Sequence, residues 1–348
     1  MTFYDLLAFA VACDASDLHL RSGQAPWVRV RGKLQLLKDA SLVLEQSWLH
    51  ASLTACMSAN DVKRWQHQLA LDFACEVPAL GRFRAHVFQH SLGCGATFRI
   101  LRSRLPTLSQ LHAPPVLTQW LNHKGLLLVT GATGSGKSTT LAALVQHLNT
   151  HEALHIVTLE DPIEFVHISQ QSLITQREIG LHSPSFAAAL RAVLREDPDV
   201  ILVGEMRDHE TIQLALTAAE TGHLVLASLH TRSAASSVER IIDVFAGAEK
   251  NWIRSQLSEA LIGIVSQELH PSPNGQARHA VFETLSATHA VRHLIKEGKT
   301  SQLQSAMQTG AALGMQTMSQ ALELAGQHGL IGKNPRMLEK NQASEQTL

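Results

Sequence analysis

The sequence predicts an α/β fold in two domains, a smaller α+β domain followed by a larger doubly wound one. In the second part of the chain, continuous apolar runs alternate with helical patterns, which is typical of strands in a sheet covered by helices on both faces. The first hundred residues instead show short, alternating strands. With 348 residues and 45% hydrophobic content, the chain can bury two cores.

The N-terminal part, 1–101, reads as α+β. Short extended runs lie between residues 17 and 37, and a helical pattern covers 44–69. The runs GRFRAHVFQ and GATFRIL then alternate apolar with polar residues, so each predicts a strand with one polar face. That face carries Arg82, Arg84 and Arg99.

The best candidate for a linker is 102–113, because the stretch RSRLPTLSQLHAPP contains three prolines and no sustained period. A second domain is therefore expected over 114–348. Its apolar runs are LLLVTG, HIVTLE, VILVGE and HLVLASLH. From about Ser233 the pattern predicts an almost wholly helical region, ending in a polar tail from about Gly332.

A phosphate-binding loop is the most specific motif in the chain. Residues 131–138, GATGSGKS, fit G-x-x-x-x-G-K-[ST], with an apolar run before them and a helical pattern after them. Glycines let backbone N–H groups wrap round phosphates at a helix N-terminus. The predicted nucleotide-binding residues are Gly131, Ala132, Thr133, Gly134, Ser135, Gly136, Lys137, Ser138 and Thr139. Lys137 would bridge the β and γ phosphates, and Ser138 would offer its hydroxyl to Mg²⁺.

The strand predicted at 200–203 ends in Gly204 and Glu205 rather than in an Asp-Glu pair. We expect this strand to lie beside the strand of the phosphate loop, with Gly204 leaving room next to that loop. Glu205 can then reach Mg²⁺ directly or through one water. The competing interpretation, an acidic residue that begins a helix, suits Asp208 better because Asp is a strong N-cap.

The acidic run TLEDPIEF follows another apolar strand, and Pro162 stiffens its turn. Glu164 is thereby held beyond the carboxyl end of the strand, where ligands bind in open α/β sheets. A carboxylate there could accept a proton from an attacking water. A solvated acidic turn explains the residue types equally well.

Two histidines, His223 and His230, bracket the run HLVLASLH, so they lie at opposite ends of one strand and cannot both touch one phosphate. In a chain with 20 histidines, a single one is more often a satisfied polar group than a catalyst. His230 is favoured over His223 because it stands at the carboxyl end of its strand, toward the nucleotide.

Composition argues against several classes of protein. The 29 basic and 30 acidic residues leave no excess charge for nucleic acid or anionic lipid, and 5% aromatic content leaves little for base stacking. The four cysteines show no C-x-x-C spacing, so free thiols are expected. No apolar run reaches the length of a membrane span, and the N-terminus does not resemble a signal peptide. We therefore expect a cytoplasmic protein without direct membrane insertion.

The motifs GATGSGKST, TLEDPIEF, LREDPDVILVGEMRD and TGHLVLASLHT, in this order, resemble the Walker A, Asp, Walker B and His boxes of the type II/type IV secretion ATPase superfamily. Further segments, among them DASDLHL, GRFRAHVF, LITQREIG and GMQTMSQAL, resemble the PilT-type retraction ATPases of type IV pili. The run Ala-Val-Arg-His-Leu-Ile-Lys-Glu at 290–297 is similar to their AIRNLIRE pattern, with Val291, His293 and Lys296 as departures.

The resemblance implies a RecA-like ATPase domain with a helical C-terminal part, preceded by a PAS-like domain. It implies ATP and Mg²⁺, with Glu205 on the magnesium side, Glu164 as catalytic base and His230 as sensor of the γ-phosphate. Arginines of the N-terminal domain reach the nucleotide in that family, and Arg82, Arg84 and Arg99 are the candidates here; a solvated strand face is the alternative. The implied partners are five further copies in a homohexamer, an inner-membrane pilus platform protein and a second retraction ATPase.

The function predicted on this basis is a motor that couples ATP hydrolysis to pilus retraction (twitching motility), at the cytoplasmic face of the inner membrane. A first alternative is an ATPase for pilus assembly or type II secretion. Such relatives usually carry a longer N-terminal extension and a four-Cys zinc insertion, neither of which this sequence contains. A second alternative is a nucleotide-binding accessory subunit beside a principal motor.

Overall fold

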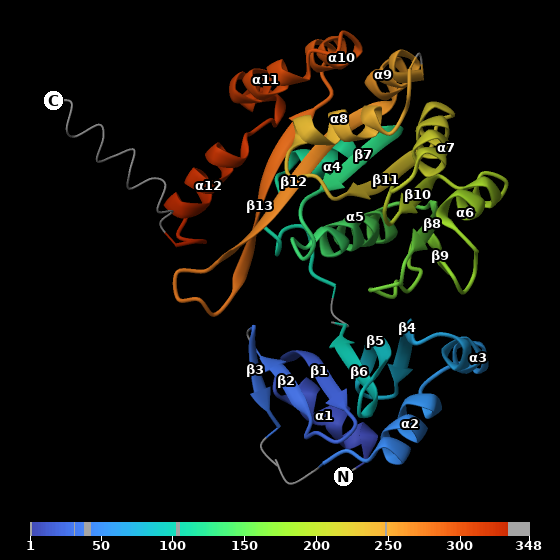
Figure 1. Cartoon of the computed structure of the whole chain (residues 1–348). Coiled ribbons are helices and arrows are strands. Elements are labelled where there is room, and N and C mark those ends of the chain that lie inside the picture. The colour runs from blue at the N-terminus through green and yellow to red at the C-terminus, as the bar shows by residue number, and fades with distance from the viewer. Residues whose placement is uncertain (1, 31, 38–42, 102–104, 248, 333–348) are drawn as a thin grey trace. The chain divides into compact units, whose positions relative to one another are not determined.

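The computed structural model describes residues 2–30, 32–37, 43–101, 105–247 and 249–332. The chain divides into one unit of Met1–Arg104 with Pro162–Val166, and a second of Leu105–Asp161 with His167–Leu348 (Figure 1). Of the predicted linker, 102–104 lie outside the described residues, whereas Leu108 is buried in a core of the second unit. The predicted polar tail also lies outside the described residues, except for Gly332 at its start.

The first unit is built on an antiparallel sheet. In its described residues the strands run in the order β3-β2-β1-β6-β5-β4. They are β1 (Ala15–Arg21), β2 (Trp27–Val30), β3 (Lys33–Leu36), β4 (Ala70–Val77), β5 (Gly81–His90) and β6 (Gly93–Ile100), with helices α1 (Phe3–Ala12), α2 (Gln46–Ala55) and α3 (Ala59–His67). This confirms the predicted smaller α+β domain.

Apolar and polar residues alternate along β5, so one face of this strand is buried and the other is polar. Phe83, Ala85 and Val87 are fully buried in the core of this unit, as expected of a half-buried strand. The predicted helical stretch 44–69 proves to be two helices, because Ser58 caps the second one and accepts a hydrogen bond from the Asp61 N–H. All the cysteines of the chain lie in this unit, within described residues, as free thiols.

The second unit is a mixed sheet with helices on both faces. In its described residues the strands run in the order β13-β12-β7-β11-β10-β8-β9, and every neighbouring pair is parallel except β12 with β13. The strands are β7 (Gly125–Thr130), β8 (His155–Glu160), β9 (Leu173–Glu178), β10 (Val200–Val203), β11 (Leu224–Leu229), β12 (Leu261–Pro271) and β13 (Arg278–Ser286).

Helices of the second unit form two layers. The helices and short 3-10 turns are α4 (Val116–Trp120), α5 (Lys137–His151), α6 (Phe186–Val193), α7 (His209–Glu220), α8 (Ala234–Asp243), α9 (Glu249–Ala260), α10 (His289–Lys296), η1 (Thr300–Gln302), α11 (Leu303–Thr309), η2 (Ala311–Leu313) and α12 (Met318–Gln327). Buried residues of α6, α7, α8 and α9 share one core with the sheet. Those of α4 and α5 share another, on its opposite face. The predicted α/β class is therefore confirmed.

One expectation about the sheet is wrong. The strand that ends in Gly204 does not lie beside the strand of the phosphate loop, because β11 pairs with β7 on one side and with β10 on the other. All six residues of β11 are buried, so this strand fills an interior position of the sheet. Its own carboxyl end therefore stands between the phosphate loop and Glu205.

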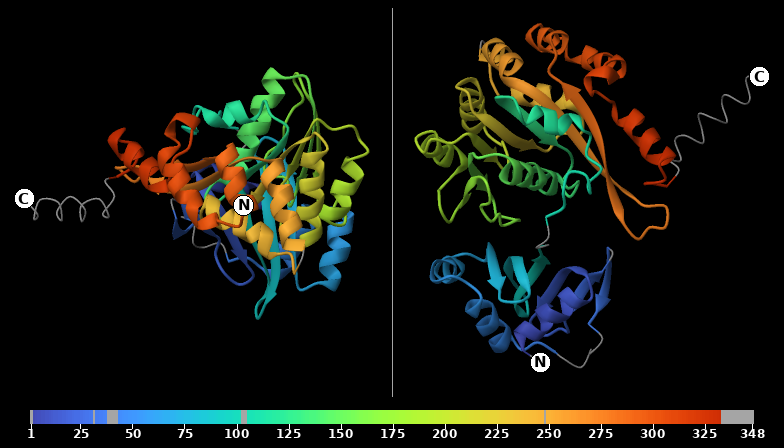
Figure 2. Two further views of the ribbon diagram at one scale, coloured as in Figure 1. Left: turned by 90° about the horizontal axis from the view of Figure 1, so that it is seen from above. Right: turned by 180° about the vertical axis from the view of Figure 1, so that it is seen from behind.

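The expectation of an almost wholly helical region after Ser233 is also wrong in part. Within this region, the segment WIRSQLSEALIGIV (252–265) is helical only to Ala260, where α9 ends, and continues as strand β12. Pairing with β7 buries the run that begins at Leu261, and β13 then extends the sheet. Helix α12 packs along β13, whereas buried residues of α10 and α11 join the core of α6 to α9 (Figure 2).

No helix within the described residues combines the length and the apolar character that crossing a membrane requires.

Candidate active site

The phosphate loop connects the buried strand β7 to helix α5. Gly131 and Gly136 both have left-handed φ, 148° and 91°, a region that glycine adopts without strain. A Cβ on Gly131 would lie 2.5 Å from the Gln267 carbonyl oxygen, so close backbone packing also demands glycine there. Ala132, Thr133 and Gly134 form the exposed rim of the loop. The loop thus has the strand-before, helix-after setting that the motif requires.

Lys137, the first residue of α5, is only 8% exposed. Its Nζ donates to the Gly131 carbonyl at 2.8 Å and to the Ala132 carbonyl at 3.1 Å. It also lies 3.2 Å from Nδ1 of His230. The ammonium is therefore held inside the loop by groups that a phosphate could replace.

His230 links the lysine to the acidic side of the site. Its Nε2 lies 2.9 Å from Oε1 of Glu205. Because a lysine ammonium can only donate, Nδ1 of His230 must accept, and the ring proton of the neutral histidine then stands on Nε2 and is donated to Glu205. Sheet register explains the placement: Leu229 pairs with Thr130, so His230 follows at the level of Gly131.

Glu205 is held on two sides. Its Oε2 lies 2.7 Å from Nη2 of Arg207, and the carboxylate is 18% exposed. Burial by itself raises the pKa of Glu205, but the hydrogen bond from Arg207 and the neighbouring His230 lower it by more, so the pKa lies below the usual value of a glutamate. Glu205 is therefore an ionised oxygen donor at neutral pH.

Gly204 does not make room for the phosphate loop, contrary to expectation. A Cβ at this position would lie 2.9 Å from the Leu159 carbonyl oxygen and 3.4 Å from Cα of Glu160. The Gly204 N–H donates to that same Leu159 carbonyl at 2.8 Å. The glycine is thus required by the close approach of β8 and β10. Asp208, by contrast, caps α7 as predicted and accepts from the Thr211 N–H at 2.8 Å.

Ser138 of the loop and Glu205, which is linked to the loop through His230 and Lys137, are oxygen donors that suit a magnesium nucleotide. The Ser138 hydroxyl is on an exposed residue at the start of α5, and the Glu205 carboxylate is ionised; both are the hard oxygen ligands that Mg²⁺ prefers. The Ser135 hydroxyl is buried, and among the described residues it has no hydrogen-bond partner. An unsatisfied polar atom inside the loop fits a site built for a polar ligand.

Glu164 lies in the segment Pro162–Val166, beyond the end of β8, and this segment belongs to the first unit. Its proposed part as a base stays a prediction. The neighbouring Glu160 serves the sheet edge instead: its Oε1 accepts from the Thr158 hydroxyl at 2.7 Å and from the Gln176 amide at 2.9 Å.

The three arginines stand on neighbouring strands of the first unit. Arg84 on β5 lies directly opposite Arg99 on β6, and Arg82 lies opposite Glu76 on β4. Arg99 donates through Nε to the buried Asp17 at 3.0 Å, although its side chain is 63% exposed. Their contact with nucleotide stays a prediction.

His223 has a structural place at the other end of β11. Its Nδ1 lies 2.9 Å from the Ala218 carbonyl and 3.2 Å from the Thr221 hydroxyl. His223 therefore binds the C-terminal turn of α7. It precedes β11 and His230 follows it, so the two histidines lie at opposite ends of this strand, as predicted.

The sequence prediction missed two residues that touch the site. Arg207 forms an ion pair with Glu205, and the Glu-x-Arg spacing in the sequence could have indicated this pair. Gln267 donates to the Ser135 carbonyl at 2.7 Å. Its signal was a polar side chain inside the apolar run LIGIVSQELH, because buried polar groups in such runs need specific partners.

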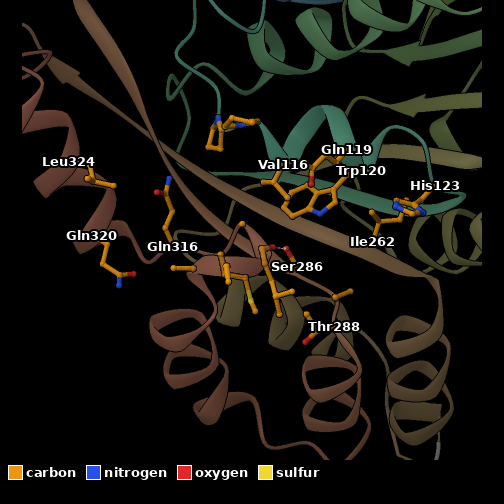
Figure 3. A pocket seen from close by; sticks show the side chains of 18 of the residues that line it. Val116, Gln119, Trp120, His123, Ile262, Ser286, Thr288, Gln316, Gln320 and Leu324 are labelled. Carbon is orange, nitrogen blue, oxygen red and sulfur yellow. Dashed lines mark hydrogen bonds between the residues drawn. The ribbon is translucent and has the colours of Figure 1, made fainter.

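A large open cavity of about 1090 Å³ lies elsewhere in the second unit (Figure 3). Its walls come from α4, the start of β12, the turn before α10 and helix α12, and include Trp120, Arg292 and Gln320. The residues that line it include neither the phosphate loop nor Glu205 and His230. The candidate nucleotide site lies instead at the loop between β7 and α5, whose rim Ala132–Gly134 is exposed.

Comparison with known proteins places the chain among secretion and pilus proteins. The family model described as type II/IV secretion system protein matches residues 83–328. A type IV pilus retraction ATPase, PilT, of Pseudomonas aeruginosa is 47% identical over 96% of both chains. A twitching motility protein of Neisseria gonorrhoeae is 48% identical over 88% of this chain and 82% of its own. The crystal structure of the pilus retraction motor PilT with bound ADP has a TM-score of 0.88 at 40% identity, covering 98% and 99% of the two chains.

Proposed function

The chain belongs to the type II/IV secretion system protein family, and we propose that it is an ATPase that drives retraction of a type IV pilus. The observation that carries the enzymatic part is the series of contacts from Lys137 through His230 to Glu205, which joins a phosphate loop to an ionised carboxylate. Near full-length similarity to a pilus retraction ATPase and to a twitching motility protein supports the task.

ATP binds to the loop 131–139. The loop N–H groups and the positive end of α5 attract the phosphates. Lys137 gives up its bonds to the Gly131 and Ala132 carbonyls and turns to the β and γ phosphates, an exchange that keeps the ammonium hydrogen-bonded throughout. Magnesium, when bound beside Ser138 and Glu205, neutralises charge that develops on the phosphates.

Glu164 is the proposed base. It accepts the proton of the water that attacks the γ-phosphate, while Glu205 stays ionised at the metal. Its position after a proline-stiffened turn supports this division, because the proton acceptor must stay fixed while the metal ligand remains charged.

His230 is the proposed sensor of the γ-phosphate. In the structure its Nδ1 accepts from Lys137 and its Nε2 donates to Glu205. When Lys137 turns to phosphate, Nδ1 loses its donor and the ring can reorient. His230 thereby converts occupancy of the loop into a change at Glu205.

Arg82, Arg84 and Arg99 are proposed to contact the nucleotide from the first unit. The chain is proposed to act as a homohexamer at the cytoplasmic face of the inner membrane, on a pilus platform protein and beside a second retraction ATPase. Helix α10 supports a partner contact: Val291 and Ile295 anchor it in the core, while His293 and Lys296, two departures from the family pattern, lie on its exposed side.

Steady-state turnover and nucleotide binding test the enzymatic proposal. We expect Lys137→Ala to lose ADP binding, whereas Glu164→Gln keeps binding and loses turnover. Glu205→Gln should strongly lower turnover, and the residual turnover should require a higher Mg²⁺ concentration than that of the wild type. Wild-type turnover in both glutamate variants would refute the assignment, and mass photometry of the purified protein tests the hexamer.

A gene deletion tests the task. Cells that stay piliated but cannot retract their pili are expected. Bald cells would indicate an assembly or secretion ATPase instead. Unchanged retraction would indicate an accessory subunit.

A further inference from the structure

Gln267 is a buried glutamine whose whole carboxamide is engaged at the phosphate loop. The residue is 2% exposed on β12. Its Nε2 donates to the Ser135 carbonyl at 2.7 Å, and its Oε1 accepts from the Thr140 hydroxyl, also at 2.7 Å. Thr140 is itself fully buried on α5. One side chain thus joins the middle of the loop to the helix that follows it.

Sheet register brings Gln267 to this place across 132 residues of chain. Strand β12 runs parallel to β7 with Ser266 opposite Thr130, so Gln267 stands at the level of Gly131. A Cβ on Gly136 would lie 2.8 Å from Nε2 of Gln267. The carboxamide is therefore packed directly against the loop, and His230 of β11 stands on the other side of Gly131.

The conformation of the loop explains why such a partner is needed. For N–H groups to point inward at phosphates, the carbonyls must point outward or be satisfied from elsewhere. Lys137 satisfies those of Gly131 and Ala132 and leaves them when it turns to phosphate. The Ser135 carbonyl depends on Gln267, which lies behind the loop and can keep its bond in both states.

We propose that Gln267 is a positioning residue that holds the phosphate loop in its nucleotide-binding conformation by tying Ser135 to Thr140. The inference rests on the proposed nucleotide site. The primary amide of Gln267 donates to the Ser135 carbonyl and accepts from the Thr140 hydroxyl at the same time. A methionine fills similar volume with no donor, and a glutamate sets an acceptor against the Ser135 carbonyl.

The test compares Gln267→Met with Gln256→Met, both measured for ADP affinity by calorimetry and for thermal unfolding without nucleotide. Gln256 is a matched control because it is also buried and donates to Glu220, at 2.7 Å, on the helical layer. Both variants should lower the melting temperature. Gln267→Met alone should weaken ADP binding roughly tenfold, the loss that corresponds to about one hydrogen bond.

Every other outcome either supports or overturns the positioning role of Gln267. Wild-type affinity in Gln267→Met, or equal weakening in both variants, overturns the inference. A wild-type protein that does not bind ADP overturns the proposed function first. If Gln267→Met does not fold, Thr140→Val decides, because it removes the hydroxyl at nearly constant volume: weaker ADP binding supports the positioning role, and unchanged binding overturns it.

Discussion

Replacing Gly204 with alanine tests whether the approach of β8 and β10 sets the position of Glu205. Gly204 is not among the glycines with positive φ, so alanine meets no left-handed strain there. The obstacle is steric, because the new Cβ would lie 2.9 Å from the Leu159 carbonyl oxygen. Gly204 cannot simply move away, since its N–H bonds that carbonyl and its own carbonyl accepts from the Ser228 hydroxyl.

The expected magnitude follows from this contact. Relieving it requires the strand ends to separate by roughly half an ångström, which for overpacking in a core costs about 1–3 kcal/mol. For a unit of this size, each kcal/mol lowers the melting temperature by about 2–4 °C, so a fall of about 2–12 °C is expected. Because a misplacement of about 1 Å can cost a hundredfold in rate, the shift of Glu205 should lower kcat roughly tenfold.

The assay is thermal unfolding together with steady-state ATP turnover and ADP affinity. ADP affinity should stay within about twofold of wild type, since β11 separates Gly204 from the phosphate loop. Gly326→Ala is the control, because a Cβ there meets no atom within 4 Å and alanine favours a helix. Unchanged melting temperature and kcat in Gly204→Ala would refute the reasoning.

Two further changes test the electrostatics of the second unit. Burial lowers the pKa of His167 from 6.5 to about 4. The neutral histidine therefore contributes fully to folding stability above pH 6.5, and this contribution is lost as the pH falls through about 4. His167→Gln should remove up to about 3 kcal/mol of this acid destabilisation, measured by urea unfolding between pH 7 and pH 4. The Glu283 carboxylate accepts hydrogen bonds from the Ala234 N–H, at 2.8 Å, and the Met318 N–H, at 3.2 Å, at the starts of α8 and α12. Glu283→Gln replaces one carboxylate oxygen by an NH₂ group, which faces one of these N–H donors. We expect the free energy of unfolding to fall by about 1–3 kcal/mol in urea unfolding at pH 7.

Features encoded by neighbouring residues could be predicted from the sequence, and those that depend on distant pairing could not. The phosphate loop, the cap at Asp208 and the alternation of β5 are local patterns, and the structure has them as predicted. The order of the strands is a property of the whole sheet. No pattern near Gly204 indicates that β11 separates its strand from β7.

The same limit explains the misread C-terminal region and the missed glutamine. The run after Ala260 is apolar enough for a buried helix or a buried strand, and only its pairing with β7 decides between them. Gln267 acquires its partners through that pairing, because Ser135 and Thr140 lie far away in sequence. A polar residue in an apolar run signalled a partner without identifying it.

The packing of β10 against β8 also limits which carboxylates of the proposed site can bind metal and which can accept a proton. An aspartate at position 204 would place its Cβ 2.9 Å from the Leu159 carbonyl oxygen, which is too close. Of residues 200–205, Glu205 is therefore the one carboxylate that this strand end can present, and His230 and Arg207 keep it ionised. An ionised carboxylate with depressed pKa suits a metal and is a poor acceptor for a proton. This division supports our proposal that another segment supplies the base, with Glu164 as the candidate.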